Sequence, residues 1–174
     1  MFADVFQRTY AMQVIGLRYF NVFGARQDPN GAYAAVIPRW VARLLCDEPC
    51  LIFGDGETSR DFCYIANVVQ ANLLAAAGAG PDASGQSYNI ACGESTSLRE
   101  LFYLIRDGLA ADRPAIAAAQ PVYTDFRAGD IARSRASIEK ARRLLGYEPT
   151  HQLADGLSEA LRWYVSGSGL TDPA

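Results

Sequence analysis

Segments with the composition of strands alternate with segments of helical periodicity along almost the whole chain. Strands are expected over residues 13–22, 50–53, 61–65 and 87–90 and near Val122, and helices over residues 2–10, 34–45, 68–77, 98–109, 137–145 and 153–165. Ser97 and Glu100 have the spacing of a capping box at the start of one helix. Residues 78–85 and 110–119 are expected to be flexible joints, and residues 166–174 a frayed tail. This alternation predicts an α/β fold.

Composition limits the classes of protein that the chain can represent. With 174 residues, half of them hydrophobic, the chain can bury one core, so one domain or a piece of one is expected. The net charge of -3 argues against a nucleic-acid partner, and neither a long apolar run nor a leader peptide is evident, so no membrane partner and a cytoplasmic location are expected. Four cysteines without a CxxC pair indicate free thiols, and a single histidine makes a zinc site improbable.

Few side chains in the chain are suited to nucleophilic or acid–base chemistry. Lys140 is the single lysine, and it is expected on the solvated face of a helix that Gly146 ends. His151 is the single histidine and follows Pro149 in a loop. Sequence distance leaves a Ser/His/Asp or Cys/His arrangement open, but no nucleophile stands in a GxSxG turn. Hydrolase chemistry is therefore disfavoured, and no catalytic residue is assigned.

Asn21 stands at the end of the first predicted strand, before a turn at Gly24. Ligands of open α/β sheets lie beyond the carboxyl ends of strands, where an amide can donate to a phosphate oxygen and accept from a sugar hydroxyl. The alternative is an asparagine that closes a turn, and the spacing alone favours that alternative.

Two arginines stand beside turns that contain glycine or aspartate. Arg60 comes after Gly54 and Gly56, just before a predicted strand, while Arg127 precedes Asp130. Two guanidinium groups could bind a diphosphate in pairs of hydrogen bonds, and Asp130 could accept from a ribose hydroxyl. The alternative is ordinary surface ion pairs, with Arg60 beside Asp61 or Glu57 and Arg127 beside Asp125 or Asp130.

Several long strings in the chain resemble those of a known family. They are LRYFNVFG, IPRW, IFGDGETSRDFCYI, ANVVQANLLAA, YNIACGESTSL, FRAGDIARSRASIEKARRLLGYEP and GLSEALRWY. The chain resembles, from residue 1 to about residue 164, the C-terminal half of extended short-chain dehydrogenases/reductases of the NAD-dependent sugar-nucleotide epimerase/dehydratase family. FNVFGARQDPNGAYAAVIPRW and GDGETSRDFCYI are most similar to bacterial UDP-N-acetylglucosamine 4-epimerases.

The resemblance implies both an architecture and a set of binding residues. Residues 1–33 would be the last part of a Rossmann-type domain, residues 34–165 mainly the smaller sugar-nucleotide-binding domain with returning sheet elements, and residues 166–174 a flexible tail. The implied substrate-binding residues are Asn21, Arg60 and Arg127 for diphosphate, Asp130 for ribose, and Ala35, Val36 and Trp40 for the nucleotide and its uracil. Tyr19 and Phe20 would line the NAD and sugar pocket. Val36 and Trp40 equally suit the apolar face of a helix, and Leu51 stands where some relatives carry an aromatic residue.

Two motifs of the resembled family are missing from the chain. No glycines have GxGxxG or GxxGxxG spacing, and no tyrosine precedes Lys140 by four residues. The resemblance places the YxxxK pair just before residue 1, where the tyrosine would accept the proton from the sugar C4 hydroxyl as hydride passes to NAD.

The expectation is the substrate-binding half of an NAD-dependent 4-epimerase of UDP-N-acetylglucosamine or UDP-glucose, inactive alone. The alternatives are part of a related dehydratase or decarboxylase, and a non-catalytic nucleotide-sugar-binding module. Because the predicted strand over residues 13–22 would lack a neighbour, self-association is expected. Residues 2–10 would form half of a helix pair in a homodimer.

Overall fold

The computed structural model of the chain describes residues 2–31, 35–77 and 79–166. Its α-helices are α1 (Phe2–Tyr10), α2 (Val36–Leu45), α3 (Ile65–Ala77), α4 (Leu98–Ala110), α5 (Glu139–Leu145) and α6 (Leu153–Val165). Its strands are β1 (Ile15–Tyr19), β2 (Val22–Phe23), β3 (Leu51–Phe53), β4 (Ser59–Arg60), β5 (Cys63–Tyr64), β6 (Gln86–Ile90), β7 (Thr96–Ser97) and β8 (Val122–Thr124). Two short 3-10 helices, η1 (Pro81–Ala83) and η2 (Pro114–Ala118), complete the fold, which is α/β as predicted.

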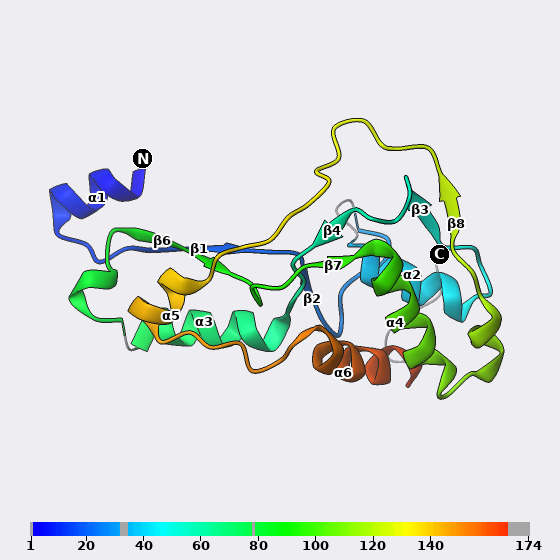
Figure 1. The fold of residues 1–174 in the computed structure, drawn as a ribbon. Coiled ribbons are helices and arrows are strands. Elements are labelled where there is room, and N and C mark those ends of the chain that lie inside the picture. The colour runs from blue at the N-terminus through cyan, green and yellow to red at the C-terminus, as the bar shows by residue number, and fades with distance from the viewer. Residues whose placement is uncertain (1, 32–34, 78, 167–174) are drawn as a thin grey trace.

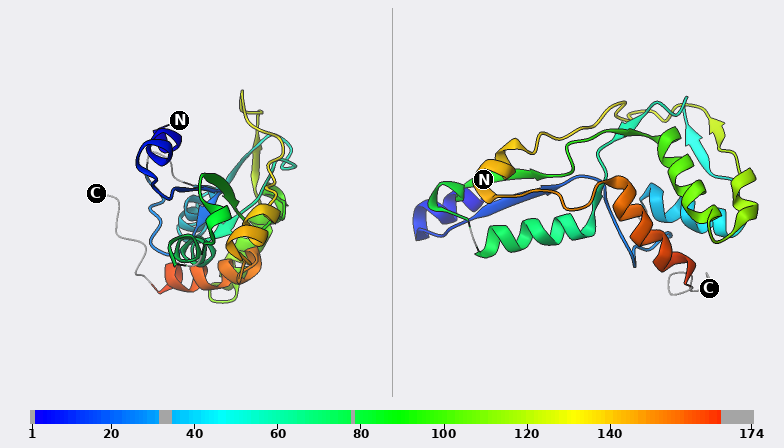
Figure 2. Two further views of the ribbon diagram at one scale, coloured as in Figure 1. Left: turned by 90° about the vertical axis from the view of Figure 1, so that its left-hand side faces the viewer. Right: turned by 60° about the horizontal axis from the view of Figure 1, so that its bottom comes forward.

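The molecule is elongated, and its strands pair two by two along its length (Figure 1). At one end β1 and β6 are parallel, with Ile15 opposite Gln86 and Tyr19 opposite Ile90. β2 and β5 form a short parallel pair, β4 and β7 an antiparallel one, and β3 and β8 a parallel pair at the other end. The segment that follows β8 runs back along the molecule to α5, so the two ends are joined by several crossings of the chain (Figures 1 and 2).

Two hydrophobic cores occupy the two ends. The first, here the β1–β6 core, is formed under the parallel pair by α3 and α5 and contains Val68, Ala71, Tyr88, Ile90, Ala141 and Tyr147. The second, here the α2–α4–α6 core, contains Ile37, Trp40, Val41, Phe102, Ile105, Leu157 and Tyr164. Apolar residues recur at helical spacing on α2, α4 and α6, so each of these helices buries one face against the others.

The strand predicted over residues 13–22 is interrupted, which corrects the sequence-based expectation. Asn21 has φ of 34°, in the left-handed region, where an asparagine is tolerated better than most residues. The Phe20 amide still donates to the Ile90 carbonyl, whereas the Asn21 carbonyl accepts from the Cys63 amide. The chain therefore changes its strand partner from β6 to β5 at Asn21.

Other boundaries differ from expectation in smaller ways. Of the strand predicted over residues 61–65 only β5 is present, because Asp61 and Phe62 are buried outside any strand and α3 already begins at Ile65. The short strand β4 lies just before the predicted range. The capping box at Ser97 and Glu100 is confirmed. Residues 110–119 are no loose joint, since they include η2 with Ile116 buried. Residues 34, 78 and 167–174, at the edges of other predicted segments, lie outside the described residues.

Asp61 ties three parts of the chain together. Its buried carboxylate accepts hydrogen bonds from the amides of Cys92 at 3.0 Å, Gly93 at 3.1 Å and Ala136 at 3.2 Å. Burial raises the pKa of this carboxyl, while the three amide donors act in the opposite direction. The carboxylate thereby holds the residues after β6 and the residues before α5 against the segment between β4 and β5.

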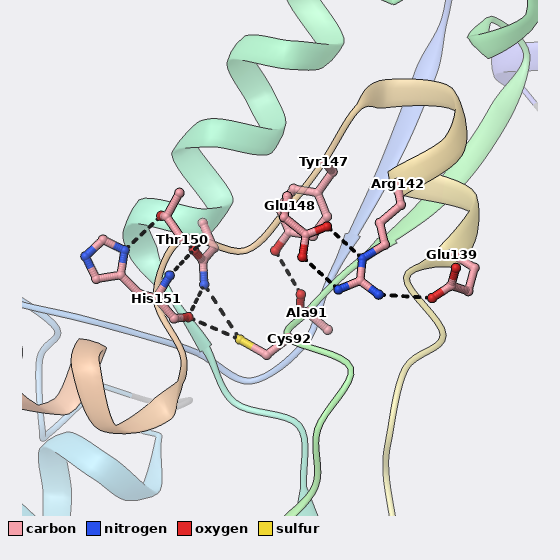
Figure 3. Close-up of polar contacts among 9 residues, drawn as sticks. Ala91, Cys92, Glu139, Arg142, Tyr147, Glu148, Thr150 and His151 are labelled. Atoms are coloured by element: carbon pink, nitrogen blue, oxygen red, sulfur yellow. Dashed lines mark hydrogen bonds and ion pairs between the residues drawn. The ribbon is translucent and has the colours of Figure 1, made fainter.

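The turn between α5 and α6 is fixed by a second buried polar group. Asn67 Oδ1 accepts from the amides of Thr150 and His151, and Asn67 Nδ2 donates to the His151 carbonyl at 2.7 Å. Figure 3 shows the backbone of Thr150 and His151 beside Cys92, with Tyr147 donating to the Ala91 carbonyl at 2.8 Å. These contacts set the direction in which α6 leaves the β1–β6 core.

Replacing Asp61 by asparagine is expected to lower the free energy of unfolding by about 2–4 kcal/mol, because in either orientation the new NH2 group would face at least one buried backbone donor. Urea denaturation followed by circular dichroism measures the change. Glu94→Gln, an exposed substitution close in sequence, is the control and should change stability by less than about 0.5 kcal/mol. Equal stability of Asp61→Asn and the unmodified chain would contradict the role given to this carboxylate.

Candidate functional site

A cavity of about 310 Å³ lies beside α2, at the end of the molecule that carries β3 and β8. Its walls come from β2, α2, β3, β4 and the segment after β8. The lining residues are Asn21, Val22, Phe23, Ala35, Val36, Ile37, Arg39, Trp40, Arg43, Leu51, Phe53, Arg60, Phe62, Leu98, Arg127 and Asp130. All seven residues for which the sequence suggested substrate binding are among them, although they are widely separated along the chain.

One face of α2 forms the apolar wall. Val36, Trp40 and Arg43 stand at successive turns of the helix, and Pro38 lies in its first turn, where a missing amide hydrogen breaks no helical bond. Trp40 is only 4% exposed, and its ring meets Phe102 edge-on with centroids 5.9 Å apart. Trp40 thus packs into the α2–α4–α6 core, as the apolar-face interpretation predicts, and it also lines the cavity. Its contact with a nucleotide stays a prediction.

Asn21 enters the cavity wall from the point where the chain leaves β1. Its Nδ2 donates to the Asp61 carbonyl at 2.9 Å, which fixes the carboxamide. Its oxygen has no hydrogen-bond partner within the described parts of the chain. The left-handed backbone supports the turn interpretation, and the same conformation presents the side chain to the cavity.

Arg60 does not form the ion pairs that its neighbours in sequence suggested. Its guanidinium pairs with Asp130 and also donates to the Ile131 carbonyl and, at 2.9 Å, to the Ser59 carbonyl. Glu57 pairs instead with Arg99 at 2.6 Å. Asp61 is occupied by backbone amides, so the alternative pairing of Arg60 with Glu57 or Asp61 is wrong.

Arg127 also avoids the expected carboxylates. Its guanidinium carbon lies 4.6 Å from the centroid of the Phe53 ring, a cation–π contact, and no ion pair joins it to Asp125 or Asp130 among the residues described. The neighbouring Phe126 ring lies against Gly54, where a Cβ would come within 2.4 Å of it, and Gly54 has φ of 83°. Glycine at position 54 therefore allows this segment to approach β3.

Two further arginines line the cavity and were missed from the sequence. Arg39 and Arg43 lie on the same helical face as Val36 and Trp40, three and seven positions after Val36, so the periodicity of α2 could have indicated them. Arg43 donates to the Pro49 carbonyl at 2.8 Å. With Arg39, Arg43, Arg60 and Arg127 against Asp130, the lining side chains carry four positive charges and one negative charge. Such a balance favours an anionic ligand with more than one charge.

Tyr19 and Phe20 are not among the residues that line the cavity. The Tyr19 hydroxyl donates to Asn72 Oδ1 at 3.1 Å, and Phe20 packs against the β1–β6 core. Dinucleotide sites use a glycine-rich turn that leads into a helix, and the described residues around Tyr19 and Phe20 provide no such turn. The described chain therefore does not fit NAD by itself, and the cofactor role of these two residues stays a prediction.

Other reactive side chains lie away from the cavity. His151 contacts the Thr150 hydroxyl at 2.9 Å, in the turn before α6 (Figure 3). It also contacts Glu159 at 3.2 Å, and none of these three residues lines the cavity. The cysteines are unpaired thiols, and burial raises the pKa of Cys50 to about 11. Lys140 donates to the Ser87 carbonyl on the outside of β6.

Within residues 2–31, 35–77 and 79–166, no group of three or more His, Cys, Asp and Glu side chains is arranged to bind a metal ion. No helix in these ranges has the length and apolar character that a membrane-spanning segment needs.

Known proteins resemble the chain in sequence and in structure. A putative UDP-glucose 4-epimerase of Methanocaldococcus jannaschii is 34% identical over 93% of this chain and 49% of its own length. UDP-glucose 4-epimerase of Thermotoga maritima, solved with UDP-glucose, superposes with a TM-score of 0.85 at 36% identity over 97% of this chain and 51% of that one. UDP-N-acetylglucosamine 4-epimerase of Methanobrevibacter ruminantium, solved with UDP-N-acetylmuramic acid, superposes with a TM-score of 0.83 at 37% identity. The superposition covers 95% of this chain and 50% of that one.

These relatives are about twice as long as the region they share with this chain, so the chain spans about half of their length. Similar proteins also include a decarboxylase and a dehydratase of nucleotide sugars. The similarity extends over both cores, which is consistent with a partial Rossmann-like domain. The profile of the NAD-dependent epimerase/dehydratase family matches residues 2–91, just over half of the 174 residues, and the chain belongs to this family.

Proposed function

We propose that the cavity binds the nucleoside diphosphate part of a UDP-sugar, and that the chain is the substrate-binding half of an NAD-dependent 4-epimerase of UDP-N-acetylglucosamine or UDP-glucose. The observation that carries this proposal is the meeting of Asn21, Arg60 and Arg127 in one cavity. These three side chains come from separate parts of the sequence, and each has donors suited to phosphate oxygens.

The cavity wall supports the same ligand. Val36, Trp40 and Leu51 give an apolar surface of the kind on which a uracil ring can lie, and Ala35 is small enough to let the nucleotide approach. Leu51 offers no aromatic ring for stacking, so Trp40 and the aliphatic side chains would provide the contact. Asp130 is the only carboxylate among the lining residues and suits the hydroxyls of a ribose.

In a 4-epimerase, bound NAD would supply the hydride chemistry at the sugar C4 carbon. The residues of this chain would hold the diphosphate while the sugar turns, so that either face of C4 can be presented. No residue of this chain is assigned as the base that takes the C4 hydroxyl proton. The chain therefore supplies the anchor of the substrate, and turnover depends on groups that it does not contain.

The same clamp suits two other functions. A nucleotide-sugar dehydratase or decarboxylase would use the diphosphate contacts and differ at the sugar, and similar proteins of both kinds exist. A non-catalytic module would bind nucleotide sugars without changing them. The epimerase is preferred because the Thermotoga maritima and Methanobrevibacter ruminantium structures, with TM-scores of 0.85 and 0.83, are both of 4-epimerases.

The proposed arrangement of domains follows from the two cores. Residues 1–33 would end a Rossmann-type domain, and residues 34–165 would form most of the sugar-nucleotide-binding part, with β6, α3 and α5 returning to the first. This is supported by the parallel pairing of β1 with β6. Tyr19 and Phe20 would face the NAD and sugar pocket. Four unpaired thiols suit a reducing compartment, and we place the protein in the cytoplasm.

Replacing Arg60 or Arg127 by alanine is expected to weaken UDP binding by about 2 kcal/mol each, roughly 30-fold in Kd, because each change removes a charge-assisted donor to the diphosphate. Isothermal titration calorimetry measures Kd. Arg162→Ala removes the same charge from α6, outside the cavity, and should leave Kd within about twofold. Unchanged affinity for UDP in both cavity variants would show that Arg60 and Arg127 do not bind the diphosphate.

The chain alone is expected to show no epimerisation of UDP-glucose or UDP-N-acetylglucosamine with added NAD, because the YxxxK pair and the glycine-rich motif are absent from its sequence. The assay is chromatography of the nucleotide sugars after long incubation at high protein concentration. Formation of the C4 epimer by the pure chain would overturn this expectation, whereas loss of water or carbon dioxide would favour the dehydratase or decarboxylase alternative.

Self-association is proposed for the end of the molecule that carries α1, β1 and α3. Among the described residues β1 pairs only with β6, which leaves its other edge open. Large apolar side chains are exposed on the same elements, including Val69 at 51% and Leu73 at 64% on α3. An open edge beside exposed apolar residues favours association with a second copy, with α1 as half of a helix pair.

Sedimentation velocity should therefore show dimers or larger species whose fraction rises with protein concentration. The double variant Val69→Glu, Leu73→Glu should raise the dissociation constant of self-association by about tenfold and so favour the monomer. The matched control is Leu104→Glu, which adds a charge at an exposed apolar position of α4 at the other end of the molecule. A purely monomeric chain at all concentrations would contradict this proposal.

A further inference from the structure

Arg60 and Asp130 form an ion pair inside the cavity that we propose as the diphosphate site. The Arg60 side chain is 18% exposed and that of Asp130 is 34% exposed, so the pair is partly shielded from water. A diphosphate would need the same guanidinium hydrogens that now point to Asp130. The Asp130 carboxylate and a bound diphosphate would therefore compete for the Arg60 guanidinium.

We infer that Asp130 competes with the diphosphate for Arg60 and, when displaced, accepts from the ribose hydroxyls, so that the cavity selects a nucleoside diphosphate over a bare diphosphate. This inference rests on the proposed function. It assigns Asp130 a role in selectivity in addition to ribose contact.

The backbone around the pair is held so that only side chains need to move. The Ser59 amide donates to the Ala132 carbonyl at 2.9 Å, and the Ser134 amide donates to the Ser59 carbonyl at 3.0 Å. Residues 132–134 are thus anchored to β4, one residue before Arg60. Asp130 stands two residues before this anchor and cannot retreat far from Arg60.

The segment that carries Asp130 is held differently on its other side. Residues 125–133 are all exposed, and Gly129 forms a turn with φ of 79° in which the Asp130 amide donates to the Arg127 carbonyl at 3.3 Å. The Asp130 carboxylate can therefore rotate between Arg60 and a neighbouring ligand by changing side-chain torsions near this turn. The rotation keeps the Arg127 contact with Phe53 in place.

The difference between the two ligands follows from their hydrogen-bond donors. Inorganic diphosphate offers mostly acceptors, and the one proton that it keeps near neutral pH lies on the strongly negative ligand itself, so the displaced Asp130 carboxylate gains little from it. A nucleoside diphosphate brings two ribose hydroxyls, which can donate to the displaced carboxylate. The ribose thus offsets the loss of the ion pair better than inorganic diphosphate does.

The test compares binding of UDP and of inorganic pyrophosphate to the unmodified chain, Asp130→Asn and Asp125→Asn by calorimetry. Asp130→Asn should bind pyrophosphate roughly fivefold more tightly, and UDP no more tightly than before, so the ratio of the two affinities falls by at least about fivefold. Asp125→Asn removes the same charge five residues away, outside the cavity, and should change both affinities by the same small factor.

A second measurement uses the unmodified chain and does not depend on the folding of a variant. UDP should bind roughly tenfold more tightly than 2′,3′-dideoxyuridine diphosphate, because the latter has no hydroxyl for Asp130. In Asp130→Asn this difference should shrink.

Each outcome is decisive. Equal changes of UDP and pyrophosphate binding in Asp130→Asn, or equal binding of UDP and its dideoxy analogue to the unmodified chain, would overturn the inference and leave the proposed function standing. Failure of the unmodified chain to bind UDP at all would overturn both.

Discussion

The arrangement of the cavity depends on Asp61. Its backbone carbonyl accepts from the Asn21 carboxamide, and its side-chain carboxylate accepts from the Ala136 amide, at the end of the segment that carries Arg127 and Asp130. Arg60 is its immediate neighbour. One buried residue therefore links the three chain segments that bring donors to the cavity, and its own charge is satisfied by backbone amides rather than by an arginine. The Arg60 guanidinium is therefore not paired with Asp61 and lines the cavity.

The balance of charge in the cavity explains why the site is suited to a ligand of high charge. Four arginines come from α2, β4 and the segment after β8, and the side chains of Arg43, Arg60 and Arg127 are each restrained by a contact. Guanidinium groups that are already oriented lose little freedom when they bind a phosphate. The ion pair with Asp130 holds Arg60 in place. A ligand that takes Arg60 from Asp130 must offer the carboxylate another hydrogen-bond donor, such as a ribose hydroxyl.

Much of the fold could be predicted from local sequence, and the reasons are physical. α1 and α6 have the predicted bounds, and the capping box at the start of α4 is present, because periodicity and end signals act over a few residues. The break at Asn21 could not be predicted, since it depends on two different strands, β5 and β6, competing for neighbouring residues. The ordered turn η2 was missed because the burial of Ile116 is a tertiary contact.

The candidate site divides in the same way. The residues Asn21, Arg60, Arg127 and Asp130 could be selected from the sequence only through resemblance to a family, since their nearest neighbours suggested ordinary turns and surface pairs. Arg39 and Arg43 were accessible through the spacing of α2 and were overlooked. The Arg60–Asp130 pair joins residues 70 positions apart, so no local pattern could reveal it.

A crystal structure of the chain with UDP bound would show directly whether the cavity holds the diphosphate. We expect diphosphate oxygens within hydrogen-bond distance of Arg60, Arg127 and Asn21, with the uracil against α2 and the Asp130 carboxylate turned from Arg60 to the ribose. UDP bound elsewhere on the molecule, with the Arg60–Asp130 pair intact, would contradict it.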